Sequence, residues 1–191
     1  RSANEPSRER IPQLLQNLER MHTPNVAITL YPGQQWRHFH EIFDRILLDA
    51  PCSGEGTLYK GTDAVKNWHI KSIRQIANLQ KKLIVSALTA LKVGGEMVYS
   101  TCALNDLENE GILAYISEKY GEKIEIIFQK KFWPHIDQTG GFFMAKIVKK
   151  ASIIDDIASE KLKNFNAEIK KFSKIAHKFL PFVVGCDIFI T

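Results

Sequence analysis

Two cysteines follow apolar, strand-like runs and could together do covalent chemistry on an electrophilic ring. Cys52 closes the run Leu-Leu-Asp-Ala-Pro-Cys at 47–52, and Cys102 closes Val-Tyr-Ser-Thr-Cys at 98–102. Strand ends at one edge of an open α/β sheet are where such folds bind ligands. A thiolate is a strong nucleophile, and a lowered pKa increases the amount of it at neutral pH. The two runs therefore predict a nucleophilic site with the carboxylate of Asp49 beside it.

A cytosine ring is a substrate that suits these groups. Its C5 is a poor nucleophile until a thiolate adds to C6, which turns C5 into an enamine-like carbon that can take a methyl group. Asp49, in contact with N3 and the amino group, would support the charge that enters the ring. A base then removes the C5 proton and the thiolate leaves. The alternative is structural, because free cysteine is among the most buried residue types.

Composition limits the class of protein. The chain has 191 residues, which suit one domain, and 45% of them are hydrophobic, enough for a sizeable core. No apolar run approaches the roughly 20 residues that span a bilayer, and the polar start has no signal-peptide pattern. Three cysteines favour free thiols in a reducing, cytoplasmic compartment. A net charge of +5 permits a polyanionic partner such as RNA without requiring one.

Strand-like and helical patterns alternate, which predicts a layered α/β sheet. Pro12 does not suit a helix interior, so the first helix must start late or kink. The last two strands have only a loop between them, which predicts an antiparallel edge. We expect helices over residues 6–22, 72–92 (stopped by Gly94-Gly95), 106–120 and 154–178, and strands over residues 25–30, 46–48, 97–99, 124–128, 142–148 and 181–190.

The motifs around the two cysteines match a known family. They are Asp-Ala-Pro-Cys-Ser-Gly at 49–54, Tyr-Ser-Thr-Cys at 99–102, Asn-Asp-Leu-Glu-Asn-Glu at 105–110 and Thr-Gly-Gly-Phe-Phe at 139–143. Over about residues 1–150 the chain resembles the Sun-type RNA 5-methylcytosine methyltransferases, in particular the bacterial enzymes that methylate a cytosine of 16S ribosomal RNA. This resemblance implies a Rossmann-like class I methyltransferase sheet with helices on both faces, and S-adenosylmethionine as methyl donor.

The resemblance also implies roles for individual residues. Cys102 is expected to be the nucleophile, Cys52 to help release the product, and Asp49 to serve both catalysis and cofactor binding. Glu5, at the end of the family's second strand, is expected to hold the ribose hydroxyls of the cofactor, although it could instead be an acid at a helix N-terminus. No metal site is expected. The implied enzyme is a monomer that acts on RNA, ribosomal RNA above all, and has no membrane partner.

Two departures from the family affect the cofactor. The first strand and glycine-rich cofactor loop should precede Arg1, so we expect a sheet that lacks them, in a piece of a longer protein. Residues 1–150 would be a partial catalytic domain, and residues 151–191 a linker helix and the start of a C-terminal extension. Pro32 stands where an acid usually lies near the adenine, so adenine recognition would have to be altered or mediated by water.

Two other functions stay open. The departures favour a non-catalytic RNA-binding module, a degenerate or truncated relative, whereas the intact Asp49, Cys52 and Cys102 favour an enzyme. A redox switch between the two cysteines would require Cα atoms within about 7 Å. In the loop after Cys52, Lys60 and Trp68 could contact RNA phosphates and bases, or Trp68 could lie in the core.

Overall fold

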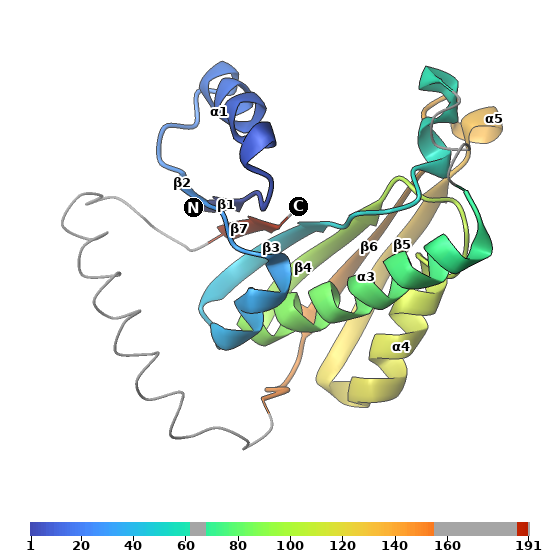
Figure 1. Cartoon of the computed structure of the whole chain (residues 1–191). Helices are drawn as coiled ribbons and strands as arrows, with labels where there is room; N and C mark the ends of the chain where they lie inside the picture. Colours follow the sequence, from blue (N-terminus) through green and yellow to red (C-terminus); the bar gives the residue numbers. More distant parts are fainter. Residues whose placement is uncertain (62–67, 155–186, 191) are drawn as a thin grey trace.

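A mixed β-sheet forms the centre of this computed structural model (Figure 1). The structure describes residues 1–61, 68–154 and 187–190. The strands in this part of the chain are β1 (Ser2–Asn4), β2 (Ala27–Thr29), β3 (Phe43–Asp49), β4 (Leu91–Thr101), β5 (Ile124–Phe132), β6 (Phe142–Lys149) and β7 (Asp187–Ile190). The helical segments are η1 (Arg8–Arg10), α1 (Ile11–Arg20), η2 (Gly33–His38), η3 (Glu55–Lys60), α3 (Ile70–Ala90), α4 (Glu110–Tyr120), η4 (Gly121–Lys123) and α5 (Pro134–Asp137).

The strand order brings the carboxyl ends of the parallel strands to one edge. The order is β2-β1-β7-β3-β4-β6-β5. The strands from β2 to β4 in this order run parallel, and β6 is antiparallel to both β4 and β5. The antiparallel end of the sheet confirms the prediction made for the last two strands. The parallel part, with helices between its strands, confirms the expected α/β class.

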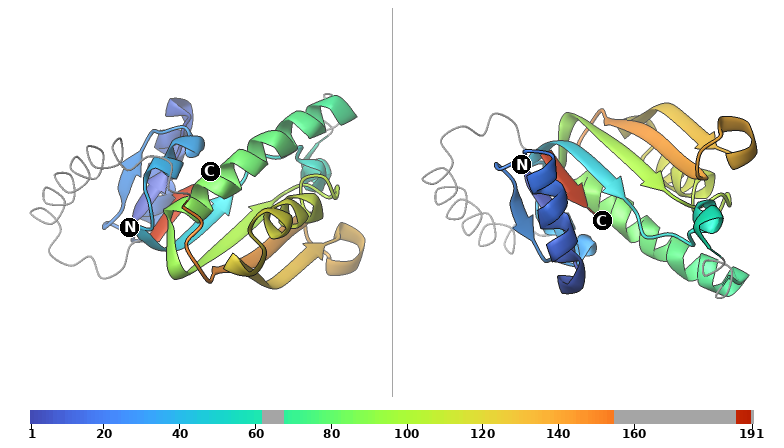
Figure 2. Two further views of the ribbon diagram at one scale, coloured as in Figure 1. Left: turned by 90° about the horizontal axis from the view of Figure 1, so that it is seen from below. Right: turned by 90° about the horizontal axis from the view of Figure 1, so that it is seen from above.

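The core lies between the sheet and two helices. α3 and α4 pack on the same face of the sheet (Figure 2). The apolar residues of α3 recur every three or four positions, which places them on one side of the helix. They meet inward side chains of the central strands, and burial of these groups is the main favourable term in folding. Fully buried members of this core are Leu48, Ile84, Ala87, Leu88, Met97, Tyr99, Ala145 and Ile147.

Proline and glycine set three element boundaries. Pro12 lies in the first turn of α1, where its missing N–H costs no helical hydrogen bond, so the helix starts late, one of the two outcomes expected. The prediction that Gly94-Gly95 stops the second helix is wrong, because α3 ends at Ala90 and the glycines lie within β4. Gly94 has a φ of +80°, and the β3–β4 register shifts here, from Phe43 opposite Leu91 to Arg45 opposite Glu96. Such an irregularity is a usual place for glycine in a strand.

The central position between β1 and β3 is taken by β7, which comes from the other end of the chain. The resemblance predicts that the sheet lacks the family's first strand. In the structure, β7 lies between β1 and β3 and pairs in parallel with both of them. The apolar strand expected over residues 181–190 is described only as β7, and the helix expected over residues 154–178 lies almost wholly outside the described residues. The division at residue 150 stays a prediction.

The register shows which residues emerge together at the carboxyl edge. Asn4 of β1 and Leu48 of β3 both pair with Ile190 of β7. The next residues, Glu5 and Asp49, therefore leave the sheet at the same level, with β7 between them. Asp49 in turn lies opposite Ser100 of β4. Among the described residues, no helix is long and apolar enough to cross a membrane.

Candidate active site

The two cysteine loops meet at the carboxyl ends of β3 and β4. The amide of Ala50 donates to the carbonyl of Ser100 at 2.9 Å, which continues the strand pairing into the loops. Beyond this point the sulfur atoms of Cys52 and Cys102 lie 2.7 Å apart, and both thiols are free. The sequence pattern predicts this meeting, because parallel strands end at the same edge. The redox alternative stays a prediction, because both cysteines are free thiols here.

The two thiols do not ionise alike. Cys52 is the more buried sulfur, and donation of its proton to Cys102 lowers the pKa of Cys102 to about 7, although burial opposes this. The same hydrogen bond, followed by burial, raises the pKa of Cys52. The amide of Cys102 also donates to Cys52 Sγ at 3.2 Å, a weaker contribution in the opposite sense. The charge of the pair therefore resides on Cys102 near neutral pH, while Cys52 keeps its proton.

This asymmetry predicts the pH dependence of alkylation in the complete gene product. Iodoacetamide should modify Cys102 with a midpoint near pH 7, because its pKa is lowered to about 7 from an ordinary 9.0. Cys52→Ala removes the proton donor and should move that midpoint up towards 9. Cys52→Ser, the matched control, keeps a hydroxyl donor and should stay lower than the alanine variant. Mass spectrometry of the peptide with Cys102 measures each rate, and identical midpoints in all three proteins would contradict the assignment.

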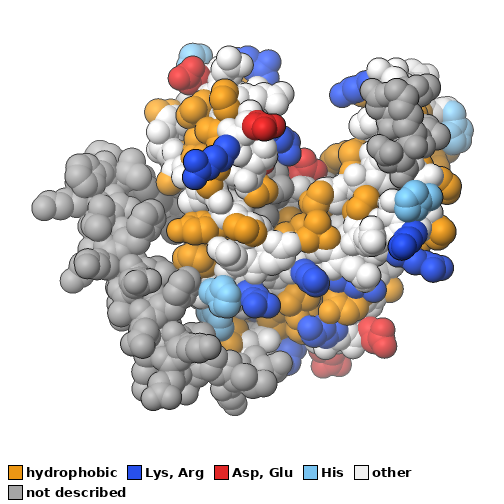
Figure 3. Space-filling model, in the orientation of Figure 1, with side chains coloured by type: hydrophobic (Ala, Val, Ile, Leu, Met, Phe, Trp, Pro, Cys, Tyr) orange, Lys and Arg blue, Asp and Glu red, His pale blue; other side chains and the backbone are white. Residues whose placement is uncertain are grey.

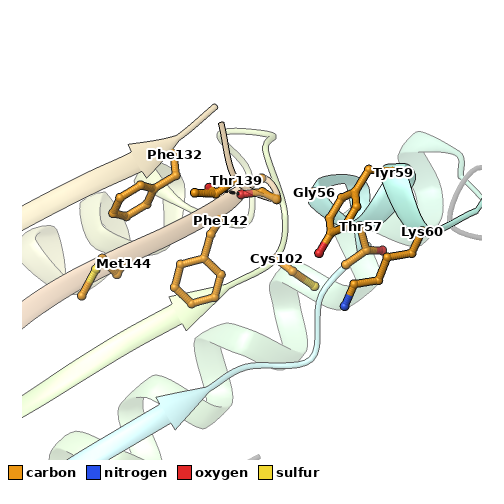
Figure 4. Close-up of a pocket in the computed structure, with 11 residues that line it drawn as sticks. Gly56, Thr57, Tyr59, Lys60, Cys102, Phe132, Thr139, Phe142 and Met144 are labelled. Carbon is orange, nitrogen blue, oxygen red and sulfur yellow. Dashed lines mark hydrogen bonds between the residues drawn. The ribbon is translucent and has the colours of Figure 1, made fainter. Parts of the chain in front are cut away.

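Cys102 opens into a pocket of about 540 Å³ (Figure 4). In the close-up its sulfur lies between Phe142 on one side and Thr57 on the other. The aromatic walls of the pocket suit a planar ring, and its volume leaves room for more than the ring alone. The residues around it come from η3, the end of β4, and the β5–β6 hairpin: Gly56, Thr57, Tyr59, Lys60, Cys102, Phe132, Thr139, Gly140, Gly141, Phe142 and Met144.

Glycine lets η3 approach the nucleophile. The amide of Gly56 donates to the carbonyl of Cys102 at 2.7 Å, and the amide of Gly141 donates to the carbonyl of Gly56 at 2.9 Å. A Cβ atom on Gly56 would lie only 1.9 Å from the Gly141 oxygen and 2.8 Å from the Cys102 oxygen. Because residue 56 is glycine, the part of η3 that lines the pocket can bond directly to the backbone of Cys102.

Gly56→Ala should destabilise the protein by about 3 kcal/mol, because backbone atoms on both sides must move to admit a methyl group. Gly94→Ala is the matched control: its new Cβ meets nothing within 4 Å, and only the positive φ is unfavourable, which costs about 1 kcal/mol. Urea unfolding of the two variants measures the difference. Equal losses would show that the close packing around Gly56 is not a constraint.

Asp49 and Glu5 occupy different surroundings at the carboxyl edge. Asp49 is exposed, and its Oδ1 accepts a hydrogen bond from Ser100 Oγ at 3.1 Å. Glu5 is only 4% exposed. Its carboxylate accepts from the Ser7 amide at 2.8 Å and pairs with Arg10 at 3.3 Å. These are the contacts of an acid at the start of a helical segment, so a role in ribose binding stays a prediction.

The helix predicted over residues 106–120 begins only at Glu110, and the residues before it build the site instead. Glu108, which lies within that predicted range, is fully buried. It accepts hydrogen bonds from the Ser53 amide at 3.0 Å and from Gln80 Nε2 at 2.9 Å. Sequence reasoning missed this role. The available signal was the pair Asn105 and Asn109, since asparagine favours turns and caps over helix interiors.

Lys60 lies at the pocket, whereas Trp68 contacts the loop that follows Cys52. Lys60 is exposed, lines the pocket and lies over the ring of Tyr59. Trp68 is 50% exposed, and its indole N–H donates to Glu55. The alternative that Trp68 belongs to the core is therefore wrong. Figure 3 shows the surface hollowed between the α1 region and the η3 region, above the carboxyl edge.

Comparison with protein-family models identifies the chain. Residues 2–148 match the family described as 16S rRNA methyltransferase RsmB/F. The chain belongs to the RsmB/F family. The match includes both cysteine loops, the buried Glu108 and every residue that lines the pocket.

Curated members of the RsmB/F family are similar to the chain over most of its length. The ribosomal RNA small subunit methyltransferase F of Shewanella piezotolerans is 42% identical over 193 aligned positions, covering 91% of this chain and 40% of the relative. The protein of the same name from Shewanella amazonensis is 44% identical, covering 79% of this chain and 36% of the relative. The chain thus spans about two fifths of the length of these relatives.

Solved structures share the fold. NSun6 from Pyrococcus horikoshii, solved with SFG, has a TM-score of 0.69 and 29% identity and covers 79% of this chain and 41% of its own. A methyltransferase homologue from the same organism has a TM-score of 0.65 and 27% identity, with coverages of 78% and 52%. These similarities confirm the expected methyltransferase fold.

Proposed function

We propose that the complete protein methylates C5 of a cytosine in 16S ribosomal RNA, in the cytoplasm, with S-adenosylmethionine as methyl donor. The observation that carries the proposal is a cysteine with a lowered pKa, Cys102, that opens into a pocket lined by aromatic side chains and contacts a second thiol. Membership of the RsmB/F family supports the RNA substrate. A pocket of this kind serves a base only once it has left its stack, because C6 is otherwise covered.

The carboxyl edge suits the proposed cofactor. Glu5 and Asp49 leave strands that lie two positions apart, with β7 between them. At about 4.8 Å per strand this separates their backbones by roughly 10 Å. Asp49 is exposed, whereas Glu5 is oriented by Ser7 and Arg10. Carboxylates at strand ends bind ribose hydroxyls in related nucleotide sites. S-adenosylmethionine would supply an electrophilic methyl group at this edge.

The geometry supports an order of events in which the Cys102 thiolate reacts first and the Cys52 thiol loses its proton afterwards. The Cys102 thiolate forms a bond to C6, and the electron pair of the C5–C6 double bond moves onto the C5–C4–N3 part of the ring, while the amino group donates a hydrogen bond to the Asp49 carboxylate. This bond removes the negative charge from the Cys102 sulfur. The hydrogen bond and repulsion that raise the pKa of Cys52 are then lost. Cys52 can now lose its own proton to solvent. Once C5 carries the methyl group that S-adenosylmethionine would supply, the Cys52 thiolate takes the proton from C5. The electron pair of that C–H bond re-forms the C5–C6 double bond, the C6–S bond breaks, and the Cys102 thiolate returns.

The rim of the pocket offers groups for RNA. Tyr59 is exposed and packs against Gly140, and Lys60 is beside it. Aromatic faces stack on unstacked bases, and lysines bind phosphates. We expect these two residues to hold the nucleotides beside the target cytosine.

Bisulfite mapping of 16S ribosomal RNA tests the proposal. RNA from cells with the gene should show one protected cytosine that is lost on deletion of the gene and restored by the wild-type gene alone. Restoration by a gene with Cys102→Ala would exclude the covalent mechanism. No difference between the strains, together with RNA binding by the purified protein, would favour the non-catalytic RNA-binding module.

A further inference from the structure

The loop after each cysteine is held by a carboxylate from the other loop. Glu55, three residues after Cys52, accepts from the backbone amides of Leu104 and Asn105, both at 2.9 Å. Glu108, six residues after Cys102, accepts from the backbone amide of Ser53 at 3.0 Å. The two contacts cross between the loops. Asn105 joins them, because its side-chain amide donates to Glu55 at 3.2 Å and to Glu108 at 2.7 Å.

Glu55 lies nearer the surface than Glu108 but has more donors around it. Its two oxygens accept from two backbone amides, from Asn105 Nδ2 and from the indole N–H of Trp68. These donors lower the pKa of the Glu55 carboxyl, against the effect of burial. Hydrogen bonds to an ionised acceptor are about twice as strong as neutral ones. Glu55 is therefore an ionised group whose contacts are all directed at the chain that follows Cys102 or at Trp68.

We propose that Glu55 is a positioning residue that holds the Cys102 loop in register with the Cys52 loop and so keeps the two sulfur atoms in contact. This inference deepens the proposed function and rests on it for its consequence in catalysis. The sulfur contact of 2.7 Å joins residues on separate loops. The loop of Cys102 is attached to η3 by the Glu55 contacts and by the bond between the Gly56 amide and the Cys102 carbonyl.

Two substitutions distinguish the loss of positioning by Glu55 from the loss of its negative charge. Glu55→Ala and Glu55→Gln remove the same negative charge, and loss of a nearby negative charge would by itself favour a thiolate. Glu55→Gln can still turn its amide oxygen to the two backbone amides, whereas its NH₂ group would face the donors Asn105 and Trp68. Glu55→Ala keeps none of these contacts. An upward movement of the Cys102 midpoint therefore reports lost positioning.

The experiment measures iodoacetamide alkylation of Cys102 against pH in the complete gene product, by mass spectrometry. With Glu55→Ala we expect the rate at pH 7 to fall by about 5- to 50-fold, as the midpoint moves one to two units up. With Glu55→Gln the alkylation rate at pH 7 should fall by a smaller factor. Glu125→Gln is the matched control, because Glu125 lies on β5 and forms an exposed ion pair with Lys150. It should alkylate like the wild type.

A second readout follows methyl transfer. Glu55→Ala should lower kcat with little change in KM for RNA, and Glu55→Gln should restore part of kcat. Unchanged or lowered alkylation midpoints in both Glu55 variants would overturn the proposal, as would equal losses in both. Alkylation involves neither RNA nor a methyl donor. A wild-type protein that fails to methylate RNA but shows the Glu55 effect would therefore contradict the proposed function and leave the positioning role intact.

Discussion

Cys102→Ala is expected to abolish methyl transfer by the complete protein while leaving RNA binding unchanged. Among the described residues, two line the pocket with a sulfur atom, Cys102 and Met144. The alanine removes the thiol, and the thioether that remains cannot add to C6. Loss of a covalent nucleophile costs enzymes about 1,000-fold in kcat or more. Transfer of a radioactive methyl group to 16S ribosomal RNA measures the rate, and filter binding measures the affinity for RNA.

Cys102→Ser is the control for shape at this position. A serine hydroxyl does not ionise near neutral pH, so the serine variant should be as inactive as the alanine variant, although it fits the same space. Methyl transfer within tenfold of the wild-type rate in either variant would exclude Cys102 as nucleophile.

Cys52→Ala is expected to have the second largest effect, an accumulation of protein bonded to RNA. The proposed cycle needs Cys52 only after the methyl group has been transferred, when it takes the C5 proton. The substitution also raises the pKa of Cys102, because the donor that lowers it is gone. The reaction is therefore best run at about pH 8.5, where part of Cys102 still ionises. A band that resists denaturation and contains both RNA and protein should appear in a gel.

The double variant Cys52→Ala with Cys102→Ala is the matched control and should form no such band. A single Cys52→Ala variant that turns over at the wild-type rate without an adduct would show that Cys52 is a structural thiol. A band that persists in the double variant would mean that another side chain bonds to the RNA.

Local sequence patterns were sufficient to place Asp49 and the two cysteines at one edge of the sheet. The apolar runs before Asp49 and before Cys102 are buried strands of a parallel sheet, and such runs are readable because both faces are covered. The common edge then follows from topology alone. This is why both cysteines could be placed at one edge of the sheet without coordinates, whereas the contact between their sulfur atoms comes from the structure.

Long-range contacts were not predictable from the same patterns. The backbone amides that bind Glu55 and Glu108 lie 49 to 55 residues away along the chain, and a carboxylate in a loop gives no periodic signal. The helix predicted from residue 106 begins only at Glu110, because the Gly111 amide bonds the Asp106 carbonyl, five residues back rather than four, at 2.7 Å. The pairing of β7 between β1 and β3 likewise joins the two ends of the chain.

The most direct test of the central claim is the identity of the residue bonded to RNA. The Cys52→Ala protein is incubated with 16S ribosomal RNA and the methyl donor, digested with nuclease and protease, and the modified peptide is sequenced by mass spectrometry. We predict a methylated cytidine nucleotide on the peptide with Cys102. Its appearance on any other residue, or a nucleotide on Cys102 that carries no added methyl group, would contradict the proposed order of events.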